Sequence, residues 1–233
     1  TDYLMNETEI MYRQTDIWKI FRYNAFTLSQ KNMWNYGGTP FSNNASLRWQ
    51  SMTMNRYEWD VKETFAWNWL DSRLLRGGPD VRFGSYFLTS AKFNTDKAKR
   101  MMFMLKYEGD HNFEGNRFNT ISPSLTFRLG NHVYLSGQLD YAWNTDEMQY
   151  VATTSPLSSS SLTPYYYVMG HMDQKTYGLT LKLQVNVTPD ISIQFYGAPF
   201  TSIAKYDDFK LAADTKSHTF ENRFQRIDPD HLT

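Results

Sequence analysis

Hydrophobic and polar residues alternate along most of this chain with a period of two. In residues 133–143, one parity carries mainly apolar side chains and the other carries Tyr134, Ser136, Gln138 and Asp140. Residues 120–129 and 177–187 alternate in the same way. Because successive side chains of a β-strand point to opposite faces, the pattern predicts strands with one apolar and one polar face. Only two residues, Gly130 and Asn131, separate residues 120–129 from the run 133–143, counted from His132 on its polar parity, which predicts a tight β-hairpin.

The same parity analysis, applied to the whole chain, predicts about nine strands between residues 16 and 200. Their expected ranges are 16–30, 44–54, 56–70, 82–93, 99–108, 120–129, 133–151, 165–187 and 191–200. Residues 201–233 are predicted to form an outer loop. No shift in composition indicates a linker, so we expect a single domain over residues 1–233.

The predicted connections alternate in length along the chain. Short links at 55, 94–98, 130–131 and 188–190 interleave with long ones at 31–43, 71–81, 109–116 and 152–164. Transmembrane barrels show this asymmetry, with short periplasmic turns and longer extracellular loops. The pattern therefore predicts that Gly130 and Asn131 face the periplasm and that the serine-rich stretch 155–161 faces outward.

Strand length, aromatic content and charge favour a membrane barrel over a soluble one. Several predicted strands reach the 9 to 11 residues that a membrane requires, and aromatic residues make up 17% of the chain. A soluble up-and-down barrel also alternates, but its wide interior would need apolar filling. We therefore predict an all-β fold, an antiparallel up-and-down transmembrane β-barrel. Because residues 226–233 are polar and unlike a closing strand, we expect a segment of a larger barrel, incomplete at both ends.

The two parities are expected to have different surroundings. Residues of the polar parity are expected to line a wet lumen, namely Arg48, Glu58, Asp60, Lys62, Arg100, Lys106, Arg128, Gln138, Asp140, Lys182 and Gln184. Residues of the apolar parity are expected to face lipid or to form aromatic girdles, namely Trp59, Trp67, Trp69, Leu139, Tyr141, Trp143, Leu181 and Leu183. In the strand predicted at 56–70, only Glu63 interrupts the apolar parity.

Composition excludes several other classes of protein. Lys plus Arg and Asp plus Glu both number 24, so no basic field favours a nucleic-acid partner. The chain has no cysteine, which excludes disulfide scaffolds and thiolate chemistry. The mean hydropathy is −0.60, and no apolar run has the length of a transmembrane helix. No secretory signal opens the sequence at Thr1, so any such signal is expected to have been removed or to lie upstream.

Three stretches of the sequence resemble a known family. Residues 74–82 (LLRGGPDVR), 116–144 and 165–210 are similar to the outer-membrane family catalogued as domain of unknown function 5916. The Asp-Gln-Lys-Thr element at 173–176 and the Lys-Tyr-x-x-Phe-Lys element at 205–210 are its most specific parts. The resemblance implies a C-terminal barrel in the bacterial outer membrane, usually preceded by a sandwich like that of family 9 carbohydrate-binding modules. It implies no defined activity.

Two sets of residues have a composition that would suit catalysis. His132, Ser136 and Asp140 share one parity, but residues four apart on a strand are roughly 13 Å apart, too far for a catalytic relay. Nothing in the sequence places His171 beside them. Glu58 and Asp60 have a spacing close to that of glycosidase carboxylates, roughly 6 to 7 Å. Lys62 continues their row, however, so pairing of opposite charges across strands is the simpler interpretation.

The remaining motifs are weaker signals. The Gly-rich segment 76–80 lacks the Lys-Ser/Thr and the helix of a phosphate loop and is interpreted as a turn. The acidic pairs Asp207 with Asp208 and Asp228 with Asp230 lack EF-hand spacing, so no metal or cofactor is expected. Trp34, Tyr36 and residues 165–167 would be able to stack on sugars, although interfacial girdling also explains them.

The sequence therefore favours an outer-membrane barrel that is not an enzyme. Its expected role is a pore or surface platform for glycan handling or envelope transport, with outer-membrane lipid as its surroundings. Glycans or an envelope protein complex are the candidate partners. Two alternatives stay open, namely an envelope hydrolase built on the barrel and a structural partner in a larger outer-membrane complex.

Overall fold

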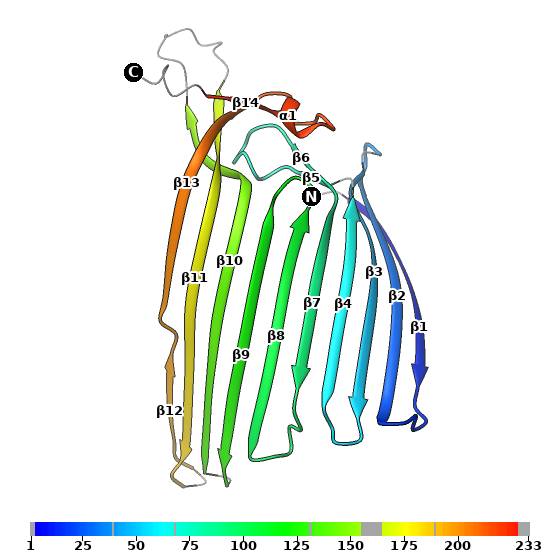
Figure 1. Ribbon diagram of the computed structural model, residues 1–233, viewed down its shortest axis with the longest axis vertical. Helices are drawn as coiled ribbons and strands as arrows, with labels where there is room; N and C mark the ends of the chain where they lie inside the picture. Colours follow the sequence, from blue (N-terminus) through cyan, green and yellow to red (C-terminus); the bar gives the residue numbers. More distant parts are fainter. Residues whose placement is uncertain are drawn as a thin grey trace.

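A single antiparallel sheet makes up most of the protein (Figure 1). The computed structural model describes residues 3–38, 40–67, 69–130, 132–154, 165–188 and 190–227, with the backbone alone for Phe41 and Trp69. The strands are β1 (Tyr3–Gln14), β2 (Phe21–Asn35), β3 (Pro40–Thr53), β4 (Glu58–Trp67), β5 (Trp69–Asp71), β6 (Val81–Phe83), β7 (Tyr86–Asn94), β8 (Met101–Asn112), β9 (Arg117–Leu129), β10 (Val133–Thr154), β11 (Tyr166–Asn186), β12 (Ser192–Gly197), β13 (Phe200–Ala212) and β14 (Phe224–Arg226). One short helix, α1 (Phe220–Arg223), precedes β14.

The strands follow one another across the sheet in chain order. Twelve strands form it, in the order β1-β2-β3-β4-β7-β8-β9-β10-β11-β13-β14, with β12 also paired to β11. Every pairing is antiparallel. The predicted all-β class and antiparallel order are thus confirmed. In the described part of the chain the sheet is open, because β1 lies at one edge and does not pair with the strands at the other.

The two faces of the sheet differ along whole rows of cross-strand neighbours. One row carries Tyr12, Phe26, Trp49, Val61, Ala91, Tyr107, Ile121, Tyr141 and Tyr177. The adjacent row carries Thr27, Arg48, Lys62, Ser90, Glu108, Thr120, Ala142 and Thr176. Because neighbouring residues of a strand point to opposite sides, the first row lies on what we call the apolar face and the second on the polar face.

The structure corrects the predicted strand boundaries at both ends. A strand that was not predicted, β1, precedes β2, and residues 200–212 form β13, which pairs with β11 instead of forming a loop. Both strands lie toward the edges of the sheet, and most of their side chains are exposed, so neither carries the strong alternation that predicted the inner strands. The predicted loop 31–43 is also much shorter, because β2 continues to Asn35 and β3 begins at Pro40.

The predicted strand 191–200 divides at Pro199. Strand β12 ends at Gly197 and β13 begins at Phe200, yet both pair with β11. Proline has no backbone N–H to donate to a ladder. Its carbonyl still accepts a hydrogen bond of 3.0 Å from the Leu179 N–H. The interruption therefore separates two parts of one line of pairing along β11.

A cap covers the end of the sheet opposite the short turns (Figure 1). It consists of residues 71–83, which include the β6 strand of the β5–β6 hairpin, and residues 213–226, which include α1 and β14. The two segments are joined by hydrogen bonds from the Arg82 N–H to the Thr215 carbonyl and from the Thr215 hydroxyl to the Asp80 carbonyl, at 2.9 and 2.8 Å. A buried hydrophobic cluster fixes the cap to β10 and β11, through Leu75, Val81, Met148, Met169 and Phe224. No helix among the described residues is long and apolar enough to span a membrane.

Candidate functional site

Most of the residues predicted to line a lumen lie together on the polar face. Ten of the eleven belong to strands and share this face by register, namely Arg48, Glu58, Asp60, Lys62, Lys106, Arg128, Gln138, Asp140, Lys182 and Gln184. Arg100 lies one residue before β8, where its carbonyl accepts a hydrogen bond of 2.7 Å from the Arg128 N–H. The parity argument therefore grouped these residues correctly on one face of the sheet.

Opposite charges pair across the strands of the polar face. Arg48 on β3 binds Asp60 on β4 through both carboxylate oxygens, at 2.8 and 2.5 Å. Gln50 also donates to Asp60, at 3.3 Å. Glu58 accepts hydrogen bonds from Lys97 and Asn94. This confirms the simpler interpretation of Glu58 and Asp60, because each carboxylate is held by basic or amide donors on other segments.

His132, Ser136 and Asp140 do not form a relay, as the sequence indicated. His132 lies in the turn before β10, where its Nδ1 is 3.2 Å from the Asn186 carbonyl. Ser136 accepts a hydrogen bond from Thr126 at 3.1 Å. Asp140 accepts hydrogen bonds from Ser122 and Gln138, at 2.5 and 2.8 Å. Each of the three groups therefore has a different partner, as the distance along the strand predicts.

Residues predicted to face lipid share the apolar face, where Trp59, Leu139 and Leu181 are exposed and the other described side chains are half-buried. By register, this face carries Trp59, Trp67, Leu139, Tyr141, Trp143, Leu181 and Leu183, whereas the side chain of Trp69 lies outside the described residues. Leu28, Leu47 and Leu139 are 54%, 56% and 57% exposed. Tyr141 stacks with both Trp143 and Tyr177, with ring centroids 5.2 and 5.0 Å apart. The structure thus presents a broad surface of uncovered apolar side chains.

Glu63 is the polar exception that the sequence indicated on the apolar parity of β4. It accepts a hydrogen bond of 2.7 Å from the hydroxyl of Thr89, its direct neighbour on β7. The charged group is therefore paired with a small polar partner instead of standing alone among apolar side chains.

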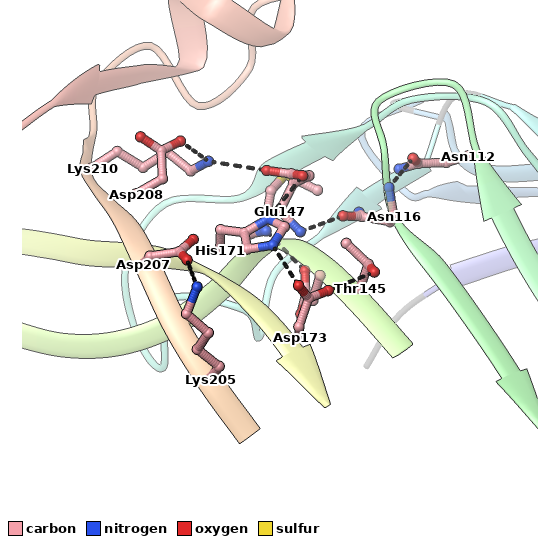
Figure 2. A network of polar contacts seen from close by, with 12 residues as sticks. Asn112, Asn116, Thr145, Glu147, His171, Asp173, Lys205, Asp207, Asp208 and Lys210 are labelled. Carbon is pink, nitrogen blue, oxygen red and sulfur yellow. Dashed lines mark hydrogen bonds and ion pairs between the residues drawn. The ribbon is translucent and has the colours of Figure 1, made fainter. Parts of the chain in front are cut away.

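A polar network that the sequence did not reveal lies beside the cap (Figure 2). The Nδ1 of His171 on β11 is 2.9 Å from a carboxylate oxygen of Glu147 on β10, and its Nε2 is 3.5 Å from Asp173. Lys210 on β13 lies 3.7 Å from both Glu147 and Asp208. Asp208 has a positive φ of 44°, beside the register shift at which β13 turns toward the cap. The network therefore joins three strands where their regular pairing is disturbed.

Charge and burial act in opposite directions on His171. Partial burial lowers the pKa of His171, but the hydrogen bond and negative charge of Glu147, supported by Asp173, raise it above its ordinary value overall. The pKa of Asp173 is lowered, mainly by the hydrogen bond that Thr145 donates at 2.8 Å and then by His171. Both shifts favour the charged pair, so this network is an electrostatic tie between β10 and β11.

A second buried charge holds the cap in place. Arg223 of α1 forms two contacts with the Glu114 carboxylate, one of them 3.0 Å long, and donates to the carbonyls of Ser217 and Arg82. The N–H of Gly84 donates to the same carboxylate at 3.0 Å. A Cβ at Gly84 would lie 2.6 Å from the Glu114 carboxyl carbon, so glycine allows this close approach. Arg223 is therefore fully satisfied although its side chain is only 1% exposed.

No signal in the sequence would have identified the network or the Arg223 pair. His171 and Glu147 are 24 residues apart, and Arg223 and Glu114 are 109 residues apart. Within the described parts of the chain, no group of three or more His, Asp or Glu side chains is arranged to hold a metal ion. Asn131, residues 155–164 and residues 228–233, which include Asp228 and Asp230, lie outside the described residues.

The fold and its two faces define an antiparallel all-β protein built on one extended amphipathic sheet. Within that class, the chain belongs to the family described as Domain of unknown function (DUF5916), whose model matches residues 1–230. The resemblance noted in the sequence is thereby confirmed for the family itself. No curated protein and no solved structure matches the chain.

Proposed function

We propose that this sheet is part of the wall of a transmembrane β-barrel in the bacterial outer membrane, and that its polar face lines a pore. The observation that carries the proposal is the exposed apolar face. Large side chains lie uncovered there, and Leu139 and Phe195, for example, are each 57% exposed. Leaving such a side chain in water costs roughly 1.5–3 kcal/mol relative to burial, so a surface of this size needs lipid or a partner against it.

The charges on the opposite face support the same orientation. Arg48, Asp60, Lys62, Lys92 and Lys106 form part of this face, and a row of charges facing lipid would be costly. Facing a wet lumen, they keep their hydration and pair across strands. The inverse arrangement would place Arg48 and Lys62 outside a soluble barrel and require the large aromatic side chains to fill its interior.

In this proposal the cap lies at one mouth of the lumen, opposite the short turns. Transport of solutes across the envelope is the role we infer, and a surface platform for glycans or for an envelope protein complex is compatible with the same wall. The two sets weighed for the hydrolase alternative, His132 with Ser136 and Asp140, and Glu58 with Asp60, have separate partners in the structure and give that alternative no support.

The test is to express the full-length protein and separate cells into inner-membrane, outer-membrane and soluble fractions. We expect recovery in the outer membrane and a shift in gel migration when the sample is heated, because closed barrels resist unfolding by detergent until heated. Recovery as a soluble protein would overturn the proposal and would make the apolar face an interior surface.

A further inference from the structure

Two pairs of like charges face each other directly across the strands of the polar face. Arg48 on β3 is opposite Lys62 on β4, and Lys92 on β7 is opposite Lys106 on β8. Directly opposed like charges destabilise a sheet, so this arrangement has a cost that the fold alone does not explain. The four side chains lie on four consecutive strands of the sheet, so the positive charge is concentrated in one region.

Two of these four cations are neutralised by neighbouring carboxylates. Arg48 is held by Asp60, and Lys106 lies 2.7 Å from Glu108. Neither Lys62 nor Lys92 lies within ion-pair distance of a carboxylate in the part of the chain that the structure describes, although Lys92 is directly opposite Asp60, which Arg48 already holds. Both lysines are exposed, so their ammonium groups are free to meet a solute.

The register brings these two lysines close together. Lys62 is paired with Ser90, and Lys92 lies two residues further along β7 on the same face. Such diagonal neighbours are roughly 7–8 Å apart at the backbone, a separation that long side chains span easily. The two ammonium groups are therefore able to converge on one small anion from adjacent strands.

Hydroxyl groups lie beside Lys62. A depression of about 350 Å³ opens on the polar face between β4 and β9, and Lys62, Thr64, Ser90 and Thr120 line it together with Leu88 and Phe118, whereas Lys92 lies outside it. Its rim also carries Glu108, whose carboxylate is paired with Lys106, and Asp110. Ammonium and hydroxyl donors together suit the oxygens of a small oxyanion.

We propose that Lys62 and Lys92 form an anion-binding site for small oxyanions, represented by inorganic phosphate or the phosphate group of a larger solute. Anion binding by these lysines does not require a pore. Its consequence, a lumen that selects anions over cations, rests on the pore function proposed above. Rings or clusters of Lys and Arg select anions in pores by this electrostatic mechanism.

The first experiment measures the reversal potential of the full-length protein in planar bilayers under a KCl gradient. We expect chloride to be preferred and millimolar phosphate to reduce the chloride current. In the double variant Lys62→Gln/Lys92→Gln, we expect the preference to shift toward neutrality and the phosphate block to weaken severalfold. The control is Lys31→Gln, which removes a charge from the same face at a position opposite Glu7 on β1, and it should leave the phosphate block unchanged.

The second experiment does not depend on conduction. Phosphate is titrated with the detergent-solubilised full-length protein, and line broadening in ³¹P spectra is compared between the native protein and the double variant. Saturable broadening that the double variant loses supports the site, even if no channels are seen and the pore proposal fails. Channels whose selectivity, phosphate block and ³¹P broadening are all unchanged in the double variant would overturn the anion site and leave the pore proposal standing.

Discussion

The sheet and its cap are held together in different ways. Along the sheet, each residue contacts cross-strand neighbours that the register sets, such as Arg48 with Asp60. The stabilisation of the sheet is therefore distributed over many similar contacts. In the cap, a few buried groups join segments far apart in the sequence, above all Arg223 with Glu114. The comparison indicates that a single substitution is tolerated in much of the sheet, whereas in the cap it removes one of the few contacts that hold a segment in place.

The largest effect is expected from breaking the Arg223 ion pair. Arg223→Met leaves Glu114 buried without its cation, which typically costs about 3–5 kcal/mol for a buried pair. We expect the loss to appear locally, as faster hydrogen exchange in residues 213–226 with the sheet still protected. Arg226→Gln is the matched control, because Arg226 has a side chain that is 84% exposed. Equal protection of the cap in both variants would show that Arg223 does not hold it.

A somewhat smaller effect tests the two faces of the sheet. Leu139→Arg places a charge on the apolar face, which in lipid costs about 2–4 kcal/mol near the bilayer midplane. Gln138→Arg changes the adjacent residue on the polar face, beside Asp140, and should cost little. The measurement is the yield of heat-modifiable protein in the outer membrane. Similar yields for both variants would contradict the assignment of the apolar face to lipid.

Within the sheet, removing one charge pair is expected to have a modest effect. Arg48→Met should reduce the free energy of unfolding by about 1 kcal/mol at most, because the pair is partly exposed and solvent screens it. A double-mutant cycle with Asp60→Asn, followed by chemical denaturation in detergent, measures their coupling. A coupling as large as that of Arg223 with Glu114 would remove the distinction between sheet and cap.

The smallest effect concerns pH. Since the pKa of His171 is raised by Glu147, its contribution to stability is complete below the ordinary histidine value and is lost as pH rises through the folded-state value. Asp173, with a lowered pKa, contributes above the ordinary aspartate value and loses its contribution as pH falls through its own folded-state value. The network is therefore most stable at a pH between the ordinary pKa values of aspartate and histidine.

This window is measured as hydrogen-exchange protection of β10 and β11 from mildly acidic to mildly alkaline pH. We expect a change of about 0.5 kcal/mol across the histidine transition, since the pair is partly solvated. The His171→Gln variant should remove the alkaline part of the dependence. The titratable groups around His171 are Glu147, Asp173, Asp207 and Lys210. If the pH profile of protection is unchanged in the His171→Gln variant, the pH dependence belongs to one of these groups.

The sheet was predictable because its information is local. Period-two alternation identified β9, β10 and β11, and parity alone grouped Lys62 with Asp60 and Leu139 with Tyr141. The strands β1 and β13, toward the edges of the sheet, were not predicted because their exposed side chains need not alternate. The cap was not predicted for a different reason, since nothing local in the sequence relates Glu114 to Arg223 across 109 residues.

The open edge of the sheet has a consequence for handling the protein. The outer side of β1 has no strand beside it in the described part of the chain, so its backbone donors and acceptors are available to another chain. If this polypeptide is produced without a strand to occupy that edge, copies are expected to join edge to edge and accumulate as insoluble aggregates. Refolding trials should therefore be performed at low protein concentration, where intermolecular pairing is slow.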